Sequence, residues 1–162
     1  MKAVVQRVRN ATVTVEGKIS GSIALGLLVY LGVTGSDSEK DAQWIAEKIA
    51  NIRIFPDAQG KMNLSLPDVL SGEKQPDGII DINGTIGVLA VSQFTLLADA
   101  RKGRRPYYGD AAAPEKAKIL YEYFMDRVRE HGLICEQGVF QAHMDVSYTN
   151  DGPVTIILDS QQ

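Results

Sequence analysis

The chain has 162 residues, of which 44% are hydrophobic and 23% charged, and its formal net charge is −3. This length fits one domain, which buries roughly 70% of the surface of its unfolded chain. Its apolar runs are far shorter than the ~20 residues of a membrane-spanning helix. The acidic balance is not typical of nucleic-acid-binding proteins, so any contact with RNA must be local.

Cysteine and histidine usage narrows the class of protein further. Cys135 is the only cysteine, which excludes an intrachain disulfide and favours a reducing cytoplasm. The charged Lys2 leads straight into strand-like sequence, so we expect no secretory signal. His131 and His143 are the only histidines. With a single cysteine and no ligand spacing, the sequence predicts no metal site, and we expect no cofactor.

The N-terminal part of the chain is predicted to form strands. Residues 4–8 and 12–15 alternate between apolar and polar side chains, as half-buried strands do. Glu16-Gly17-Lys18 has the composition of a turn. Residues 27–33 form a continuous apolar run, which is typical of a buried strand.

Two segments show the signals of helices. Ser36-Asp37-Ser38-Glu39 offers a capping box, and apolar residues at helical spacing follow it. We therefore predict a helix from Asp37 to about Asn51. Pro114 suits a first helical position, an apolar face follows, and Gly132 marks the end of this second helix.

The remaining elements complete an α+β domain. Residues 86–91 form another buried strand, and residues 144–148 alternate ahead of the apolar run 156–158. Short connections between strands indicate mostly antiparallel pairing. The sequence thus predicts antiparallel β-sheets in a sandwich or barrel-like core, with two main helices packed on the outside. All of residues 1–162 form this single domain.

A polar motif follows the strand predicted at residues 86–91. Ser92-Gln93-Phe94-Thr95-Leu96 brings hydroxyl and amide groups to the C-terminal end of a buried strand. Such a segment either caps the next turn or forms part of a site. Four cations, Arg101, Lys102, Arg104 and Arg105, follow in a loop that contains glycine and proline. They form either a solvated loop or a contact with phosphate.

A second motif lies near the C-terminus, in Asn150-Asp151-Gly152-Pro153-Val154-Thr155. Asn-Asp-Gly-Pro is good turn chemistry, so a hairpin turn is one interpretation. Gly152 also allows another molecule to approach its backbone, and Pro153 has no N–H and permits a cis bond. The other interpretation is therefore a segment that presents bare carbonyls to a ligand.

Together these motifs resemble the D-aminoacyl-tRNA deacylase family, which is marked by SQFTL and by Gly-cis-Pro within NxGPVT. The similarity covers nearly the whole chain in the expected order. It includes the opening Met1–Val8, Arg53-Ile54-Phe55 with Gly60–Asn63, Gly103–Pro106, and Gly138–Phe140 with Met144. Tyr107 departs from the family, which usually has a smaller hydroxyl-bearing residue there, and we assign it no role. Residues 67–85 include a polar, loop-like stretch, and the family generally spans this interval in fewer residues. We therefore predict a surface insertion over 67–85.

The resemblance implies an activity and a set of site residues. The reaction is hydrolysis of the ester between a D-amino acid and the 3′-terminal adenosine of tRNA. The substrate's own 2′-hydroxyl assists attack, and the backbone N–H groups of Phe94 and Thr95 bind the developing oxyanion. Gln93 and Ser92 orient the adenosine or the ester. Phe140 and Met144 line the adenine pocket, although as apolar residues they are equally natural in the core.

The resemblance also implies how substrates and partners are chosen. Carbonyls of Gly152-Pro153 act as a chiral filter that rejects L-aminoacyl-tRNA, and this segment enters the active site of the neighbouring subunit. The expected partner is therefore a second copy in a two-fold homodimer with interfacial sites. Lys102, Arg104 and Arg105 are candidate tRNA contacts. We expect neither a membrane nor DNA as a partner.

Two other classes of function remain open on the residues alone. One is an acyl hydrolase that uses the Thr95 hydroxyl as nucleophile, for which Asp99 is the nearest carboxylate in sequence. A covalent acyl-enzyme on Thr95 would select it. The other is a non-catalytic RNA-binding module, which would bind RNA through the basic loop without ester turnover.

Overall fold

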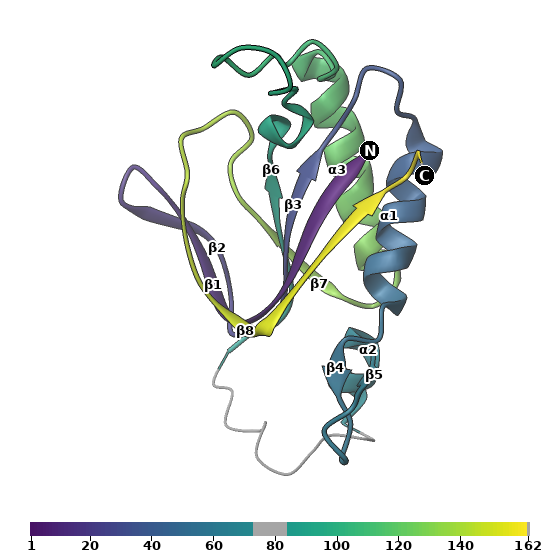
Figure 1. The fold of residues 1–162 in the computed structure, drawn as a ribbon. Helices are drawn as coiled ribbons and strands as arrows, with labels where there is room; N and C mark the ends of the chain where they lie inside the picture. Colours follow the sequence, from purple (N-terminus) through teal and green to yellow (C-terminus); the bar gives the residue numbers. More distant parts are fainter. Residues whose placement is uncertain (73–83, 162) are drawn as a thin grey trace.

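A computed structural model of the chain describes residues 1–72 and 84–161. Its main feature is one curled six-stranded sheet (Figure 1). The sheet contains β1 (Lys2–Val15), β2 (Lys18–Ile23), β3 (Leu25–Gly32), β6 (Ile86–Ser92), β7 (Ile134–Gln137) and β8 (Asp145–Asp159). The helices are α1 (Glu39–Asn51), α2 (Leu66–Ser71), α3 (Pro114–Glu130) and the 3-10 helix η1 (Phe94–Leu97). A small hairpin is formed by β4 (Phe55–Pro56) and β5 (Met62–Leu64).

Strand β1 is shared by three antiparallel neighbours. Its first half pairs with β3, its second half pairs with β2, and β8 runs along nearly its whole length. The two strands predicted at residues 4–8 and 12–15 are therefore one strand. The register with β8 shifts around Val8 and Asn10, where β1 bends.

The prediction of an α+β domain is confirmed, but the predicted antiparallel sandwich is only partly right. β6 pairs in parallel with β3 and with β7, so the single sheet is mixed and forms a half-barrel. The connections from β3 to β6 and from β6 to β7 carry helices, and such crossovers are what parallel pairing requires. The prediction assumed short connections and missed these crossovers.

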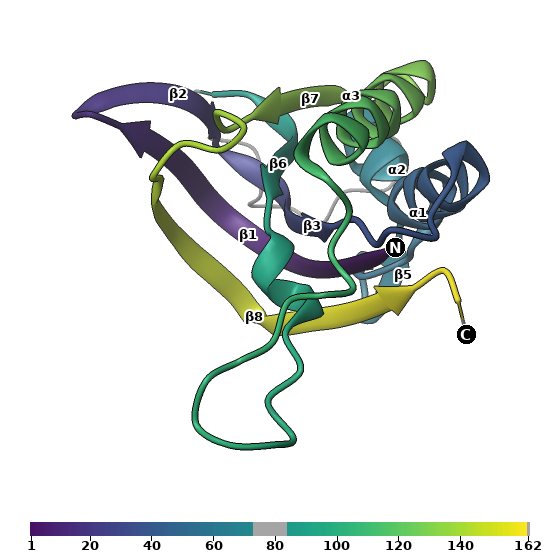
Figure 2. The same ribbon diagram turned by 90° about the horizontal axis from the view of Figure 1, so that it is seen from above.

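The curled sheet has a core on each face. On one face α1 and α3 pack together over β1, β3 and β6 (Figure 2), as predicted for the two main helices. Phe124 and Ile45 are fully buried there. On the other face the curl encloses a smaller cluster that includes Val13, Leu28 and Leu89. Two separate cores, one on each face, thus fix the positions of the strands and of the residues at their ends.

The helix α1 begins two residues later than predicted. Ser38, not Ser36, is the N-cap, and the Asp41 carboxylate accepts hydrogen bonds from the Ser38 backbone N–H and hydroxyl, both at 2.8 Å. Asp37 is buried instead, and it accepts from the Met1 amino group at 2.5 Å and the Thr34 N–H at 2.6 Å. These contacts draw Asp37 out of the helix.

The predicted surface insertion is described only at its edges. Residues 73–83 lie outside the described residues. The start of the interval belongs to α2, whose Leu66 and Val69 are buried. In residues 1–72 and 84–161, no helix combines the length and the apolar character that crossing a membrane requires.

Two glycines set the distance between β3 and β6. Gly26 and Gly87 are neighbours in the parallel ladder, and Gly26 has a φ of +143°. A Cβ on Gly26 would lie 1.8 Å from the Gly87 carbonyl oxygen, and a Cβ on Gly87 would lie 2.5 Å from the Ile134 carbonyl oxygen. Only bare backbone fits here, because backbone atoms cannot rotate away as a flexible side chain can.

Gly26→Ala is therefore expected to destabilise the fold by at least about 3 kcal/mol, since overpacking and backbone strain act together. For a chain of this size that lowers the Tm by roughly 10 °C. Gly35→Ala is the matched control, because nothing lies within 4 Å of its added Cβ and its φ is ordinary. Thermal unfolding followed by circular dichroism measures both, and equal Tm values would contradict the close-approach argument.

Candidate active site

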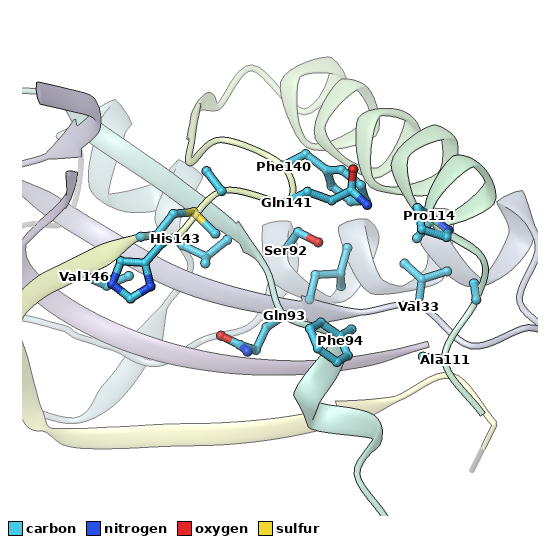
Figure 3. A pocket seen from close by; sticks show the side chains of 16 residues that line it. Val33, Ser92, Gln93, Phe94, Ala111, Pro114, Phe140, Gln141, His143 and Val146 are labelled. Atoms are coloured by element: carbon cyan, nitrogen blue, oxygen red, sulfur yellow. The ribbon is translucent and has the colours of Figure 1, made fainter. Parts of the chain in front are cut away.

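A pocket of about 580 Å³ opens at the C-terminal end of β6. Its walls come from η1, from the start of α3 and from residues 140–146 (Figure 3). Five of the predicted site residues line it: Ser92, Gln93, Phe94, Phe140 and Met144. The volume lies within the range of small-molecule sites, and it suits one nucleoside.

Strand β6 brings the polar residues to the pocket, because its central residues are buried in the sheet while the residues at its C-terminal end are partly exposed. Val88–Val91 are buried, while Ser92 and Gln93 are half-buried. The Gln93 N–H donates to the Leu31 carbonyl at 2.8 Å, which extends the ladder with β3 by one residue. The chain then turns into η1, so Phe94 and Thr95 are its first two residues. Amides at the start of a helix have no intrahelical acceptor and can bind an anion.

Thr95 lies outside the pocket lining, and its side chain is exposed. Its hydroxyl accepts a hydrogen bond from Gln93 Nε2. Asp99 is engaged by Arg101, whose Nη2 lies 2.6 Å from Asp99 Oδ2. Hydrogen bonds from the Arg101 side chain and backbone lower the pKa of Asp99 to about 2. Asp99 is therefore a weak base, and its charge is paired with Arg101.

Phe140 and Met144 belong to both the pocket and the protein interior. The Phe140 ring packs against Tyr121 at a centroid distance of 6.1 Å, and the Tyr121 hydroxyl donates to the Ala90 carbonyl at 2.8 Å. Met144 lies over Gly138, where an added Cβ would be 2.5 Å from its sulfur. These two apolar residues therefore line the pocket and also pack against the interior.

The sequence did not identify two polar residues of the pocket, Gln141 and His143. Gln141 has a φ of +63°, unusual for a residue with a side chain and frequent at functional sites. His143 Nε2 lies 3.8 Å from Asp145 Oδ1 on an exposed part of the chain. Their only signal in the sequence was their position between Phe140 and Met144.

Gly152 and Pro153 lie within the continuous strand β8, so the hairpin-turn interpretation is wrong. The peptide bond between them is cis. Both residues are exposed, and neither lines the pocket of their own chain. The structure therefore does not bring the predicted filter and the predicted catalytic residues together within one chain.

Polar contacts hold both flanks of the Gly152-Pro153 segment. Asn150 Nδ2 donates to the carbonyls of Arg7 and Val154, both at 3.0 Å. The Asp151 carboxylate lies 2.8 Å from Arg7 Nε and 2.8 Å from Arg9 Nε. Arg7 is buried, and its Nη1 donates to the Ile54 carbonyl. The segment is thus fixed to the bend of β1.

The basic loop is closed at its base by a two-residue bridge. The Asp99 N–H donates to the Tyr107 carbonyl at 2.8 Å, and the Tyr107 N–H donates to the Asp99 carbonyl at 2.9 Å. Lys102, Arg104 and Arg105 lie between these residues and are exposed. None of the three lines the pocket.

Comparisons with known proteins identify the class. The family model described as D-Tyr-tRNA(Tyr) deacylase matches residues 4–159. A D-aminoacyl-tRNA deacylase of Koribacter versatilis is 56% identical over 100% of this chain and 99% of that protein. One of Thermosipho melanesiensis is 53% identical over 100% of this chain and 99% of that protein.

Solved structures agree on the fold. A c-Myc DNA unwinding element binding protein superposes with a TM-score of 0.83 at 37% identity, covering 98% of each chain. A probable eukaryotic D-amino acid tRNA deacylase superposes with a TM-score of 0.71 at 16% identity, covering 97% of each chain, which is a likeness of fold alone.

These matches define the protein as an enzyme, a hydrolase acting on ester bonds. The chain belongs to the D-Tyr-tRNA(Tyr) deacylase family, the D-aminoacyl-tRNA deacylases. The resemblance noted in the sequence is thereby confirmed.

Catalysis by the single thiol is disfavoured by its environment. Cys135 is buried, and burial raises the pKa of its thiol to about 12. Because pH 8 lies well below this raised pKa, the thiol stays protonated and the reactive thiolate is nearly absent. We expect native protein not to react with a disulfide reagent at pH 8, whereas denatured protein releases one equivalent. Rapid labelling of the native protein would contradict this.

Proposed function

We propose that this enzyme hydrolyses the ester of D-aminoacyl-tRNA in the pocket at the end of β6, and that it rejects L-aminoacyl-tRNA through the backbone of Gly152-Pro153. The observation that carries this is that Ser92, Gln93 and Phe94, the first residue of η1, line one nucleoside-sized pocket in a member of the family.

In this proposal the pocket holds the terminal adenosine. Phe140 and Met144 offer apolar surface to the adenine, and the Ser92 hydroxyl points into the same space (Figure 3). A concave site with much apolar lining and few polar groups is what binding of a purine nucleoside requires.

The catalytic step needs an attacking group and stabilisation of negative charge. The backbone amides of Phe94 and Thr95, the first two residues of η1, are suited to hold the developing oxyanion. The 2′-hydroxyl of the substrate assists attack, so no protein nucleophile is needed. Gln93 orients the ester, and its hydrogen bond to the Thr95 hydroxyl limits the freedom of its amide. The engagement of Asp99 with Arg101 supports this scheme over a Thr95 nucleophile, because the carboxylate nearest to Thr95 in sequence is held in an ion pair.

The chiral filter and the dimer belong to one proposal. Gly152-Pro153 is exposed and lies away from the pocket of its own chain. We therefore assign it to the pocket of a second copy in a two-fold homodimer. Its carbonyls accept from the α-amino group of a D-residue, while the side chain of an L-residue meets the backbone. The contacts of Asn150 and Asp151 support this role, because a filter made of backbone must be held still.

The rest of the tRNA is proposed to contact the basic loop. Lys102, Arg104 and Arg105 are exposed cations on a loop with a closed base, which suits binding of phosphates. The net charge of −3 disfavours extended binding of duplex nucleic acid. For that reason we do not extend to this chain the DNA binding in the name of one structural relative. We place the activity in the cytoplasm, where aminoacyl-tRNA is found.

Hydrolysis of D-Tyr-tRNA and L-Tyr-tRNA by purified protein tests the function, with strong preference for the D-substrate expected. Gly152→Ala tests the filter. Its φ is +115°, and the added Cβ would lie 2.8 Å from Val154 Cγ2 and 3.0 Å from Arg7 Nη2, so the segment must shift. A shift of this kind is expected to lower kcat/KM for the D-substrate on the order of 100-fold.

Gly35→Ala is the control, because its added Cβ meets open space, and it should keep the rate and the selectivity. Circular dichroism checks folding. A Gly152→Ala enzyme with unchanged rate and D-to-L ratio would remove the filter from the proposal, and equal turnover of both substrates by the wild type would refute the function itself.

Thr95→Ala distinguishes substrate-assisted attack from a threonine nucleophile. If the amides of η1 and the RNA hydroxyl carry catalysis, this variant keeps its rate within about tenfold. A substrate ending in 2′-deoxyadenosine should react slower by on the order of 100-fold or more. Single-turnover kinetics with both substrates measures this. An inactive, folded Thr95→Ala enzyme together with fast wild-type hydrolysis of the deoxy substrate would establish the threonine mechanism instead.

A further inference from the structure

One exposed aromatic ring lies at the rim of the pocket, a second contacts it, and a third neighbours the second in the chain. Phe94 lines the pocket and is 58% exposed, so its ring lies at the rim. The Tyr108 ring meets it edge-to-face at a centroid distance of 5.2 Å and an interplanar angle of 66°. Tyr107, which directly precedes Tyr108 in the chain, is 68% exposed. Neither tyrosine lines the pocket. Large apolar surface in such a position is a frequent mark of a binding site.

The backbone fixes these rings relative to the pocket. The Tyr108 carbonyl accepts from the N–H of Ala111, a residue of the pocket wall, at 3.1 Å. Tyr107 is held by its two backbone hydrogen bonds to Asp99. Its ring lies against the backbone of Gly109, where an added Cβ would be 2.0 Å from the tyrosine oxygen. Only glycine leaves room for the ring in this position.

The position of the rings indicates which part of the substrate they contact. The pocket has room for one nucleoside, so the nucleotide that precedes the terminal adenosine must leave over the rim. Directly before Tyr107 in the chain, the same loop carries the exposed cations Lys102, Arg104 and Arg105. Aromatic rings beside cations are the elements that bind single-stranded RNA, because bases stack on rings while cations contact the phosphates.

We propose that Tyr107, with the Phe94–Tyr108 pair beside it, forms a stacking platform for the penultimate base of the tRNA acceptor end. This inference rests on the proposed function and adds a second nucleotide subsite to it. The platform contributes to substrate binding and takes no part in the chemical step, since the Tyr107 and Tyr108 rings lie outside the pocket.

Three D-tyrosyl esters test the platform: one on adenosine, one on cytidylyl-adenosine and one on tRNA. Stacking is worth about 1–3 kcal/mol per base, which corresponds to roughly 5- to 150-fold in affinity. Tyr107→Leu should raise KM by a factor in this range on the dinucleotide and tRNA esters, with kcat unchanged. The adenosine ester should react as with the wild type. Tyr107→Phe should retain wild-type KM on all three, because stacking needs the ring and not the hydroxyl.

The basic loop provides a contrast within the same experiment. Neutralising Arg104 and Arg105 with glutamine should raise KM on tRNA at low salt, and this loss should shrink as salt rises. The loss in Tyr107→Leu should persist at high salt, because stacking is not a charge effect. Sedimentation measures the oligomeric state of each variant.

Three outcomes would overturn the platform: an equal loss on the adenosine ester, an unchanged KM for Tyr107→Leu on all esters, or a changed oligomeric state in that variant, which would assign the rings to a protein contact. If the wild type hydrolyses none of the three esters, the proposed function itself fails. If it hydrolyses all three and Tyr107→Leu behaves like the wild type, only the platform fails.

Discussion

The pairing of β1 with three neighbours is the constraint on which the rest of the structure depends. One edge of β1 pairs with β3 and then with β2, and the other edge pairs with β8 through the bend near Val8 and Asn10. This bend determines where Gly152-Pro153 lies, because Arg7 and Arg9 at the bend hold Asp151. Pairing of β3 with β6 determines where Ser92 and Gln93 emerge. Both parts of the proposed site are therefore positioned from the same strand.

The elements of the fold were predictable where local sequence decides them. The apolar faces of α1 and α3, the Glu16-Gly17 turn and the buried run of β6 were predicted and are present. Sheet order was not predictable, because parallel pairing depends on crossovers rather than on any residue in the paired strands. The start of α1 was predicted wrongly because Asp37 has partners distant in sequence, Met1 among them, which no capping pattern reveals.

Motifs predicted the residues at the end of β6 better than the polar residues of the segment 140–146. Ser92, Gln93 and Phe94 line the pocket, and they were visible because they end or directly follow a strand that the sequence defines clearly. Gln141 and His143 were missed, since they lie in an irregular segment without periodicity. The partners of Gly152-Pro153 were also unpredictable, because ion pairs between residues 7, 9 and 151 join distant parts of the chain. Chemistry carried by adjacent residues is visible in a sequence, and geometry assembled from several segments is not.

The close approaches at Gly21, Gly26 and Gly87 have a consequence for how this fold diverges. An added Cβ at each would lie within 2.5 Å of a backbone oxygen of another residue. None of these glycines lines the pocket. Glycine at these positions is a requirement of architecture, so it is expected to persist in descendants that have lost the hydrolytic residues altogether. Shared glycines are therefore expected to mark this fold even in proteins in which the residues proposed for hydrolysis have changed.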